Sequence, residues 1–171
     1  IAGGGMEYPT VTVIAPTASP SLLSQVVIHE VGHNWFYGIL GSNERKNPWM
    51  DESINSFYEK LVSYNLTVDQ SYPELNKSND ALAFNNQNAD LLPIVHMHQT
   101  RQIQPITTAA DSFTSMGYGI DIYERAPYAF NTLRNYMGAD TFDNAMRTYY
   151  QAWKFKHPSP QVFESHFRNA T

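Results

Sequence analysis

Apolar residues recur at helical spacing along most of this chain and alternate with polar residues only near its start. The alternating segment Thr-Val-Thr-Val-Ile at residues 10–14 predicts a β-strand. A long helix is predicted over residues 21–40, where the apolar positions recur at helical spacing. Ser19 or Ser21 can cap the start of this helix, and Gly41 can end it.

The rest of the chain also favours helices, with one region that is harder to interpret. A second helix is predicted over residues 50–64, whereas the Asn-, Gln- and Ser-rich residues 65–119 show a weaker pattern. The other predicted helices cover residues 80–88, 124–137, 141–154 and 160 onward. Gly138 stops one of them, Asp140 caps the next, and Ser159 caps the last, which begins with a proline.

The predicted fold is therefore mainly α, of the α+β class, with one strand that marks the edge of a smaller β lobe. A chain of 171 residues with 42% hydrophobic composition is long enough for one domain with a buried core. The net charge of -5 and the scattered basic residues speak against a nucleic-acid-binding surface. The absence of cysteine excludes disulfides and thiolate metal sites. No apolar run approaches the roughly 20 residues that a membrane span needs.

The stretch VVIHEVGHNWFYG, residues 26–38, places three polar groups among the apolar residues of a predicted helix. His29 and His33 are four residues apart, so their side chains point the same way from adjacent turns. Two such imidazoles can bind one zinc ion, and Glu30 between them can act as a general base on a nearby water. The alternative is two ordinary helix histidines beside a surface glutamate.

A catalytic zinc needs a third protein ligand, and the second predicted helix offers Glu52. Eighteen residues separate it from His33, which suits a helix end, a loop and the first turn of a returning helix. A carboxylate at that position could also serve only the helix dipole. Asp51 is a candidate hydrogen-bond acceptor for a ligand histidine, or an N-terminal cap.

The pattern H-E-x-x-H, eighteen residues and then E resembles the zinc signature of the gluzincin aminopeptidases, the aminopeptidase N and leukotriene-hydrolase type. A second motif of that family, G-x-M-E-N, is matched by GGMEY, whose glutamate stands 22 residues before His29. A third, Tyr-x-Lys, is matched by Tyr-Glu-Arg at 123–125. The resemblance covers residues 3–168, with three departures: Tyr8 for Asn, Ser53 for Gly and Arg125 for Lys.

The resemblance implies a thermolysin-like zinc peptidase catalytic domain that holds one Zn²⁺ through His29, His33 and Glu52. Glu30 is then the general base for a zinc-activated water. Tyr123 would donate its hydroxyl to the developing oxyanion. A core aromatic is the alternative for Tyr123, and Tyr118 is the replacement candidate in that case. Pro127 belongs in the first turn of a helix, which predicts that Tyr123 lies just before that helix.

Glu7 is the residue that would make such an enzyme an exopeptidase. Its carboxylate can pair with the free α-amino group of a peptide, and a peptide that continued further would collide with the strand. Gly4 and Gly5 would allow close backbone approach to substrate, and Met6 completes this substrate-binding segment. The alternative is a solvated turn glutamate.

We therefore expect a zinc-dependent aminopeptidase that hydrolyses N-terminal residues from peptides, with residues 1–171 forming a single, truncated catalytic domain. The other candidates are a non-catalytic peptide-binding or scaffold domain that retains structural zinc, and an endopeptidase, against which Glu7 argues. The chain begins without a methionine in what resembles a strand, so we expect an excerpt of a longer protein with further domains. Its compartment is not predicted.

Overall fold

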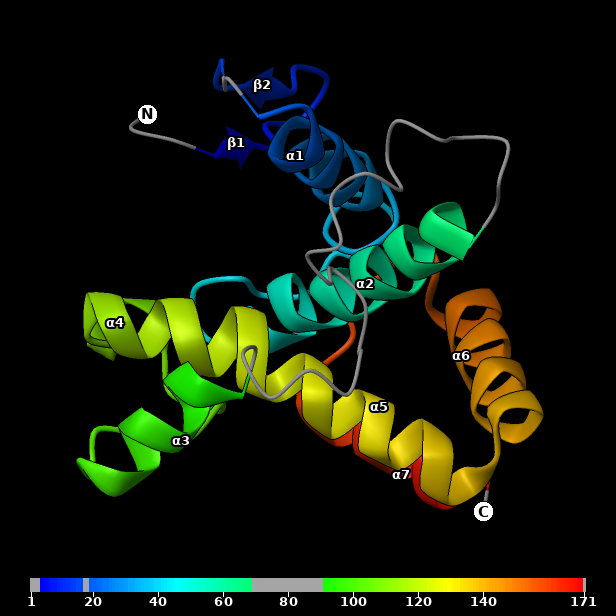
Figure 1. Ribbon diagram of the computed structural model, residues 1–171. Helices are drawn as coiled ribbons and strands as arrows, with labels where there is room; N and C mark the ends of the chain where they lie inside the picture. The colour runs from blue at the N-terminus through cyan, green and yellow to red at the C-terminus, as the bar shows by residue number, and fades with distance from the viewer. Residues whose placement is uncertain (1–3, 17–18, 69–90, 171) are drawn as a thin grey trace.

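The computed structural model describes residues 4–16, 19–68 and 91–170 of the chain, and Figure 1 shows their arrangement. These residues are mostly helical, with one small two-stranded sheet. The fold therefore confirms the predicted mainly α class with a short β edge. The helix predicted over residues 80–88 lies outside the described residues.

The sheet is a short hairpin near the start of the chain. β1 (Gly5–Met6) pairs antiparallel with β2 (Val13–Ile14), Gly5 opposite Ile14. The strand predicted over residues 10–14 is confirmed only in its last two residues, because Thr10 has a positive φ of 69° and belongs to the turn. β1 has no alternating pattern of its own, but it lies in the segment at the start of the chain that resembles a strand and that carries the GGMEY match.

The first helix, α1 (Pro20–Gly32), starts where it was predicted and ends earlier. The Ser19 side chain accepts a hydrogen bond from the Leu22 N–H, which confirms one of the two candidate caps. The predicted continuation to residue 40 is wrong: His33 is the C-cap, and the chain beyond it forms successive turns. In these turns Leu40 N–H donates to Trp35 O, five residues back, so helical spacing of apolar residues persists without an α-helix.

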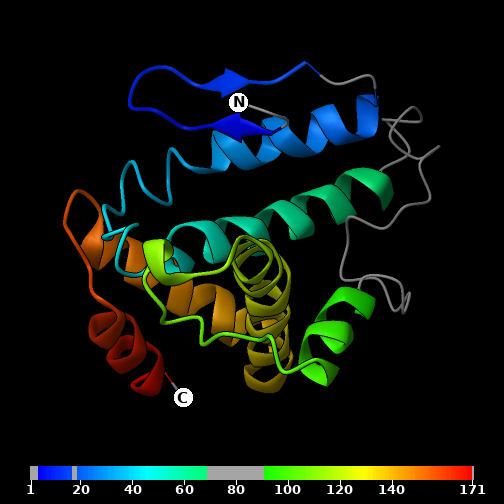
Figure 2. The same cartoon turned by 90° about the vertical axis from the view of Figure 1, so that its left-hand side faces the viewer.

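The second helix lies alongside the first (Figure 2). A 3₁₀ turn, η1 (Pro48–Met50), leads into α2 (Glu52–Val68), which confirms the predicted helix and extends it. A Cβ at Gly32 would overlap the Asn55 side chain, so this glycine lets the two helices approach closely. Asn55 Nδ2 also donates to the His29 carbonyl at 2.7 Å, which joins α1 to α2 beside the H-E-x-x-H segment. Figure 2 shows the hairpin lying along α1.

The region after the undescribed segment contains one helix that the sequence did not predict and one unusual helix. α3 (Leu92–Gln99) and the 3₁₀ turn η2 (Ala110–Ser112) precede a continuous helical run. That run consists of α4 (Ser115–Gly117), the π-helix η3 (Tyr118–Arg125) and α5 (Ala126–Met137).

Pro127 gives a physical reason for the π-helical segment. Proline has no N–H to donate and its ring disfavours an α-helical turn before it. Ala126 N–H instead donates to Asp121 O, five residues back, as a π-helix requires. Pro127 lies in the first turn of α5, and Tyr123 lies just before that helix, as predicted, within the π-helical segment η3.

The last two helices, α6 (Ala139–Trp153) and α7 (Pro160–Arg168), lie close to their predicted positions. Gly138 ends α5 with a φ of 83°, as expected of a glycine at a helix end. Asp140 is in the first turn of α6 and is not its cap, which corrects the prediction. Ser159 is the N-cap residue of α7, as predicted.

The core is an aromatic cluster beneath α2. Phe57 of α2 contacts Phe130 of α5 and Phe142 of α6, with ring centroids 6.0 and 5.5 Å apart. Phe163 of α7 stacks its edge against Tyr149 of α6 at 5.1 Å. This packing holds α2 on a rigid base, so the residues at its start have a fixed position. Within the described ranges, none of the helices combines the length and apolar character needed to cross a membrane.

Candidate metal centre

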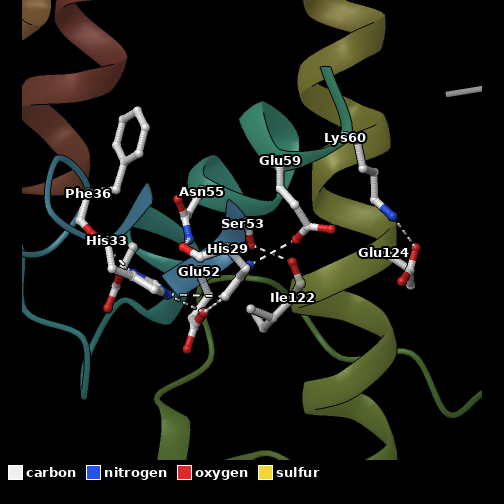
Figure 3. Close-up of polar contacts among 11 residues, drawn as sticks. His29, His33, Phe36, Glu52, Ser53, Asn55, Glu59, Lys60, Ile122 and Glu124 are labelled. Carbon is white, nitrogen blue, oxygen red and sulfur yellow. Dashed lines mark hydrogen bonds and ion pairs between the residues drawn. The ribbon is translucent and has the colours of Figure 1, made fainter. Parts of the chain in front are cut away.

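Three side chains from two helices bring their potential ligand atoms together. His29 Nε2 and His33 Nε2 are 3.1 Å apart. Glu52 Oε2 lies 3.2 Å from the first and 3.3 Å from the second. The last turn of α1 provides both histidines, and α2 begins at Glu52. Figure 3 shows the three side chains pointing toward one another.

These separations fit a tetrahedral metal ion. Ligands about 2.0–2.1 Å from a tetrahedral zinc lie about 3.3 Å from one another. The three observed separations are 3.1, 3.2 and 3.3 Å. Two imidazoles and a carboxylate are also a donor set found in catalytic zinc sites, where a fourth position is left for water or substrate. The residues present therefore fit one zinc ion.

The outer nitrogen of each histidine faces acceptor oxygens. His29 Nδ1 donates to Glu59 Oε2 at 2.9 Å. His33 Nδ1 donates to the Phe36 carbonyl at 3.0 Å and lies 2.8 Å from Asp51 Oδ1. Carbonyl and ionised carboxylate oxygens can only accept, so each Nδ1 carries the hydrogen. The two Nε2 atoms therefore face each other as potential metal ligands.

Of the two carboxylates that lie behind the histidines, the sequence predicted Asp51 and not Glu59. Glu59 was not predicted, although it follows Glu52 by seven residues, two turns along the same face of α2. That spacing is the signal that could have identified it. Asp51 Oδ1 lies 2.8 Å from His33 Nδ1 without an aligned hydrogen bond, and the Asp51 backbone carbonyl accepts from Asn55 N–H at 3.0 Å at the start of α2.

The electrostatics of the cluster favour positive charge. Burial lowers the pKa of His29, but hydrogen bonds to Glu52 and Glu59 outweigh it and raise that pKa to about 9. Burial also lowers the pKa of His33, but Asp51 and Glu52 outweigh this effect and raise that pKa to about 11. Burial also disfavours the charged form of Glu52, yet hydrogen bonds from both histidines lower its pKa to about 2. A divalent cation between α1 and α2 would meet the same environment.

A cavity of about 310 Å³ adjoins these residues. Most of the predicted site residues line it: Gly5, Met6, Glu7, His29, Glu30, Glu52 and Tyr123. His33 is buried, with 2% of its surface exposed. Gly4 lies in the hairpin, where its carbonyl accepts from Ala15 N–H at 2.8 Å.

Glu30 is held between α1 and the first strand. It is 5% exposed, and its Oε2 is buried without a hydrogen-bond partner among the described residues. Burial raises the pKa of its carboxyl group, as suits a general base. A Cβ at Gly5 would overlap the Glu30 carboxylate, so the strand backbone lies directly against this side chain. Gly5 was expected to let the backbone approach the substrate, and in the structure it lets the backbone approach Glu30.

Glu7 follows β1 and joins the acidic side of the cavity. One of its carboxylate oxygens lies within 4.8 Å of ligand atoms of His33 and Asp51. Glu44, which lies in the segment between α1 and η1, also lines the cavity. The concentration of carboxylates makes this cavity suited to a positively charged group.

Tyr123 lies beside the three potential ligands. Its ring centroid is 5.8 Å from that of His29, and its hydroxyl is hydrogen-bonded with the Glu52 carboxylate. Burial and the charge of Glu52 raise the pKa of Tyr123 far above its ordinary value, so the hydroxyl stays protonated and can donate. Tyr118 lines the same cavity, 5.7 Å from Tyr123 between ring centroids.

Side chains of α2 fix the π-helix that carries Tyr123. Ser53 Oγ donates to the Ile122 carbonyl at 2.7 Å, and Lys60 Nζ donates to Glu124 Oε2 at 2.9 Å (Figure 3). A glycine at position 53, as in the family motif, could not make the first of these bonds. The serine therefore joins the helix of Glu52 to the helix of Tyr123.

Arg125, which replaces the family's lysine, stabilises the other side of η3. Its Nε donates to Asp121 Oδ1 at 2.7 Å and its Nη2 donates to the Gln104 carbonyl at 2.5 Å. The Gln104 N–H in turn donates to Asp121 Oδ2 at 2.7 Å. This arginine thus anchors the preceding loop to the π-helix.

Comparison with known proteins identifies similar sequences. The model of the peptidase family M1 domain matches residues 7–171. The chain is 28% identical over 139 residues to endoplasmic reticulum aminopeptidase 1 of Mus musculus, which covers 78% of the chain and 13% of that protein. It is 23% identical over 161 residues to aminopeptidase B of Homo sapiens, in an alignment that covers 90% of the chain and 23% of that protein. It is 26% identical over 103 residues to leukotriene A-4 hydrolase of Xenopus laevis, in an alignment that covers 54% of the chain and 17% of that protein. The chain thus spans less than a quarter of these relatives.

Proposed function

The chain belongs to peptidase family M1, and we propose that it forms the zinc-binding part of an aminopeptidase that removes N-terminal residues from peptides. We further propose that residues 1–171 belong to a single catalytic domain and that the longer polypeptide contains further domains. Two relatives that share the family are named aminopeptidases. Their names and the family support a peptidase, and the cavity supports the finer assignment.

One observation carries the proposal. Two Nε2 atoms and one carboxylate oxygen, 3.1 to 3.3 Å apart, lie next to a buried glutamate oxygen that has no hydrogen-bond partner among the described residues. Leaving a buried carboxylate oxygen unpaired costs free energy, so a partner at this site is expected. A zinc ion and a water beside it would satisfy both groups.

Glu30 acts on the attacking water and the leaving amine, and Tyr123 acts on the carbonyl oxygen of the peptide. Bound zinc supplies Lewis acidity, which polarises the peptide carbonyl and makes water more acidic. Glu30 takes the proton from the attacking water and then passes it to the leaving amine; its raised pKa and its Oε2, which has no hydrogen-bond partner among the described residues, favour this role. Tyr123 donates a hydrogen bond to the carbonyl oxygen as negative charge develops there.

Glu7 selects the end of the peptide. Its carboxylate accepts a hydrogen bond from the free α-ammonium group of the substrate, and such a charge-assisted bond is stronger than a neutral one. β1 lies against Glu30, so the hairpin closes this side of the cavity. A peptide with a blocked N-terminus has no ammonium charge to pair with Glu7, and its blocking group would collide with β1.

The experiment compares one peptide with a free and with an acetylated N-terminus on the zinc-loaded full-length polypeptide. We expect kcat/KM to be far higher for the free peptide, and Glu7→Gln to narrow the difference. Glu44→Gln, which removes another carboxylate of the same cavity, is the matched control and should preserve the difference. Equal cleavage of both peptides by the wild type would exclude an aminopeptidase. Zinc binding without cleavage of either would favour a non-catalytic domain.

A further inference from the structure

The two histidines of the candidate metal centre are supported unequally. His29 Nδ1 has one acceptor, Glu59 Oε2 at 2.9 Å. His33 Nδ1 donates to the Phe36 carbonyl at 3.0 Å, and Asp51 Oδ1 lies nearby at 2.8 Å without receiving an aligned hydrogen bond. A backbone carbonyl thus orients the His33 ring, whereas the orientation of the His29 ring depends on the side chain of Glu59.

Glu59 has no second task among the described residues. It is 7% exposed, and its Oε1 is buried without a hydrogen-bond partner. A buried carboxylate with one unpaired oxygen is a poor means of stabilising a helix interface. Its single aligned bond, visible in Figure 3, is to the ring of His29.

The position of Glu59 on α2 makes this contact rigid. Glu52 begins α2 and Glu59 lies two turns later on the same helix. Phe57 anchors this part of the helix in the aromatic core, with 1% of its surface exposed. One helix therefore presents a potential metal ligand and, from a fixed distance, the acceptor that orients a second ligand.

We propose that Glu59 is the positioning residue of the centre: it holds the His29 ring in the Nδ1–H tautomer, with Nε2 turned toward zinc, whereas Asp51 is not needed to do the same for His33. This inference rests on the proposed zinc site. A carboxylate behind a ligand histidine fixes the ring orientation and makes it a stronger donor. The backbone carbonyl of Phe36 gives His33 that orientation without Asp51.

The test measures zinc affinity of the full-length polypeptide by competition with a chelator, in the wild type and in single variants. Glu59→Gln should bind zinc about 10–100-fold more weakly, because the amide can present its NH₂ group to Nδ1 and favour the wrong tautomer. Asp51→Asn should remain near the wild type. Glu44→Gln removes the same charge from the cavity without touching a histidine and controls for general electrostatics.

Two further measurements separate positioning from structural damage. The visible absorption spectrum of the cobalt-substituted protein reports ligand geometry, and we expect it to change in Glu59→Gln and not in Asp51→Asn. Glu59→Asp retains the charge but is one methylene too short for the 2.9 Å contact, so its zinc affinity should also fall. If Glu59→Gln does not fold, this aspartate variant decides the question.

The outcomes distinguish this inference from the function on which it rests. Wild-type affinity in Glu59→Gln or in Glu59→Asp would overturn the positioning role. An equal loss in Asp51→Asn would overturn the asymmetry between the two histidines. Absence of zinc binding by the wild type would refute the proposed zinc site itself.

Discussion

Gly5 is a residue through which the position of the candidate base can be changed. An added Cβ there would overlap the Glu30 side chain from Cγ to Oε1, so this side chain or the β1 backbone must shift. Gly5→Ala should therefore displace Glu30 and, because Glu30 is buried, lower the melting temperature. At a temperature where the variant remains folded, we expect kcat to fall by about 10²-fold, the effect of a small misplacement of a reacting group.

Gly119→Ala is the matched control, because a Cβ at that glycine meets open space. It should leave both kcat and the melting temperature near the wild type. Unchanged turnover in Gly5→Ala would mean that the contact with Glu30 has no part in catalysis.

The hydroxyl of Tyr123 is the second residue whose role can be isolated. Tyr123→Phe removes a donor that matters when charge develops on the carbonyl oxygen, so kcat should fall by about 10²–10³-fold with little change in KM. Tyr118→Phe should have a smaller effect, because the Tyr118 hydroxyl is hydrogen-bonded with Tyr123, whereas the Tyr123 hydroxyl is hydrogen-bonded with Glu52. Steady-state kinetics on an aminoacyl chromogenic substrate measures both. A larger loss in Tyr118→Phe would reassign the donor to Tyr118.

At the scale of elements, the π-helix η3 depends on its bonds to α2. Ser53 is fully buried, and its loss leaves the Ile122 carbonyl without its partner in the interior. Ser53→Ala should therefore destabilise the fold by about 1–3 kcal/mol. It should also lower kcat, because Tyr123 follows Ile122 on the same π-helical turn.

Ser56 provides a control on the same helix. It is 2% exposed and its hydroxyl has no hydrogen-bond partner among the described residues. Ser56→Ala should therefore leave the unfolding midpoint in urea unchanged or raise it. Equal destabilisation by both alanine variants would show that the Ser53–Ile122 bond contributes nothing specific.

The sequence predicted those elements whose signals are local. The Ser19 side chain caps a helix that starts one residue later, and the glycine at position 138 and the proline that begins α7 act through their own backbone, so these positions were predictable. The end of α1 was not, because the turns after His33 retain the apolar spacing of a helix while their hydrogen bonds reach five residues back.

The π-helix and the pairing of the two strands in the hairpin depend on tertiary contacts and were not predicted. η3 results from Pro127 together with a hydroxyl from α2, and only the proline is visible in the local sequence. β1 is two residues of glycine and methionine that pair with Val13–Ile14, a pairing that no periodicity reveals.

The candidate site was predictable where the motif spacing dictates geometry. His29, His33 and Glu52 follow from helix periodicity and loop length, and the structure brings them together. Glu59 was missed because a glutamate on a helix usually reads as a solvent-exposed residue. Its contact with His29 depends on the close packing of α1 against α2.

At the scale of the whole molecule, the candidate metal joins two helices that are also linked by packing, by the Asn55 bond to α1 and by the bond between His29 and Glu59. Zinc that binds only the folded state should stabilise it, by about 4 kcal/mol at a thousandfold excess over Kd. Thermal unfolding of the full-length polypeptide with and without zinc measures this. Glu52→Gln should lose most of the zinc-dependent shift, and an equal shift in that variant would place the stabilising ion elsewhere.

The central claim is that Glu30 acts as the base beside a zinc held by other residues, and the most direct test is the turnover of zinc-loaded Glu30→Gln. The amide fits the same space but cannot accept the proton. The account predicts one zinc per chain, as in the wild type, and a kcat lower by about 10²–10⁴-fold. Near-wild-type turnover at full zinc occupancy would contradict the account, and loss of zinc would show that Glu30 serves the metal itself.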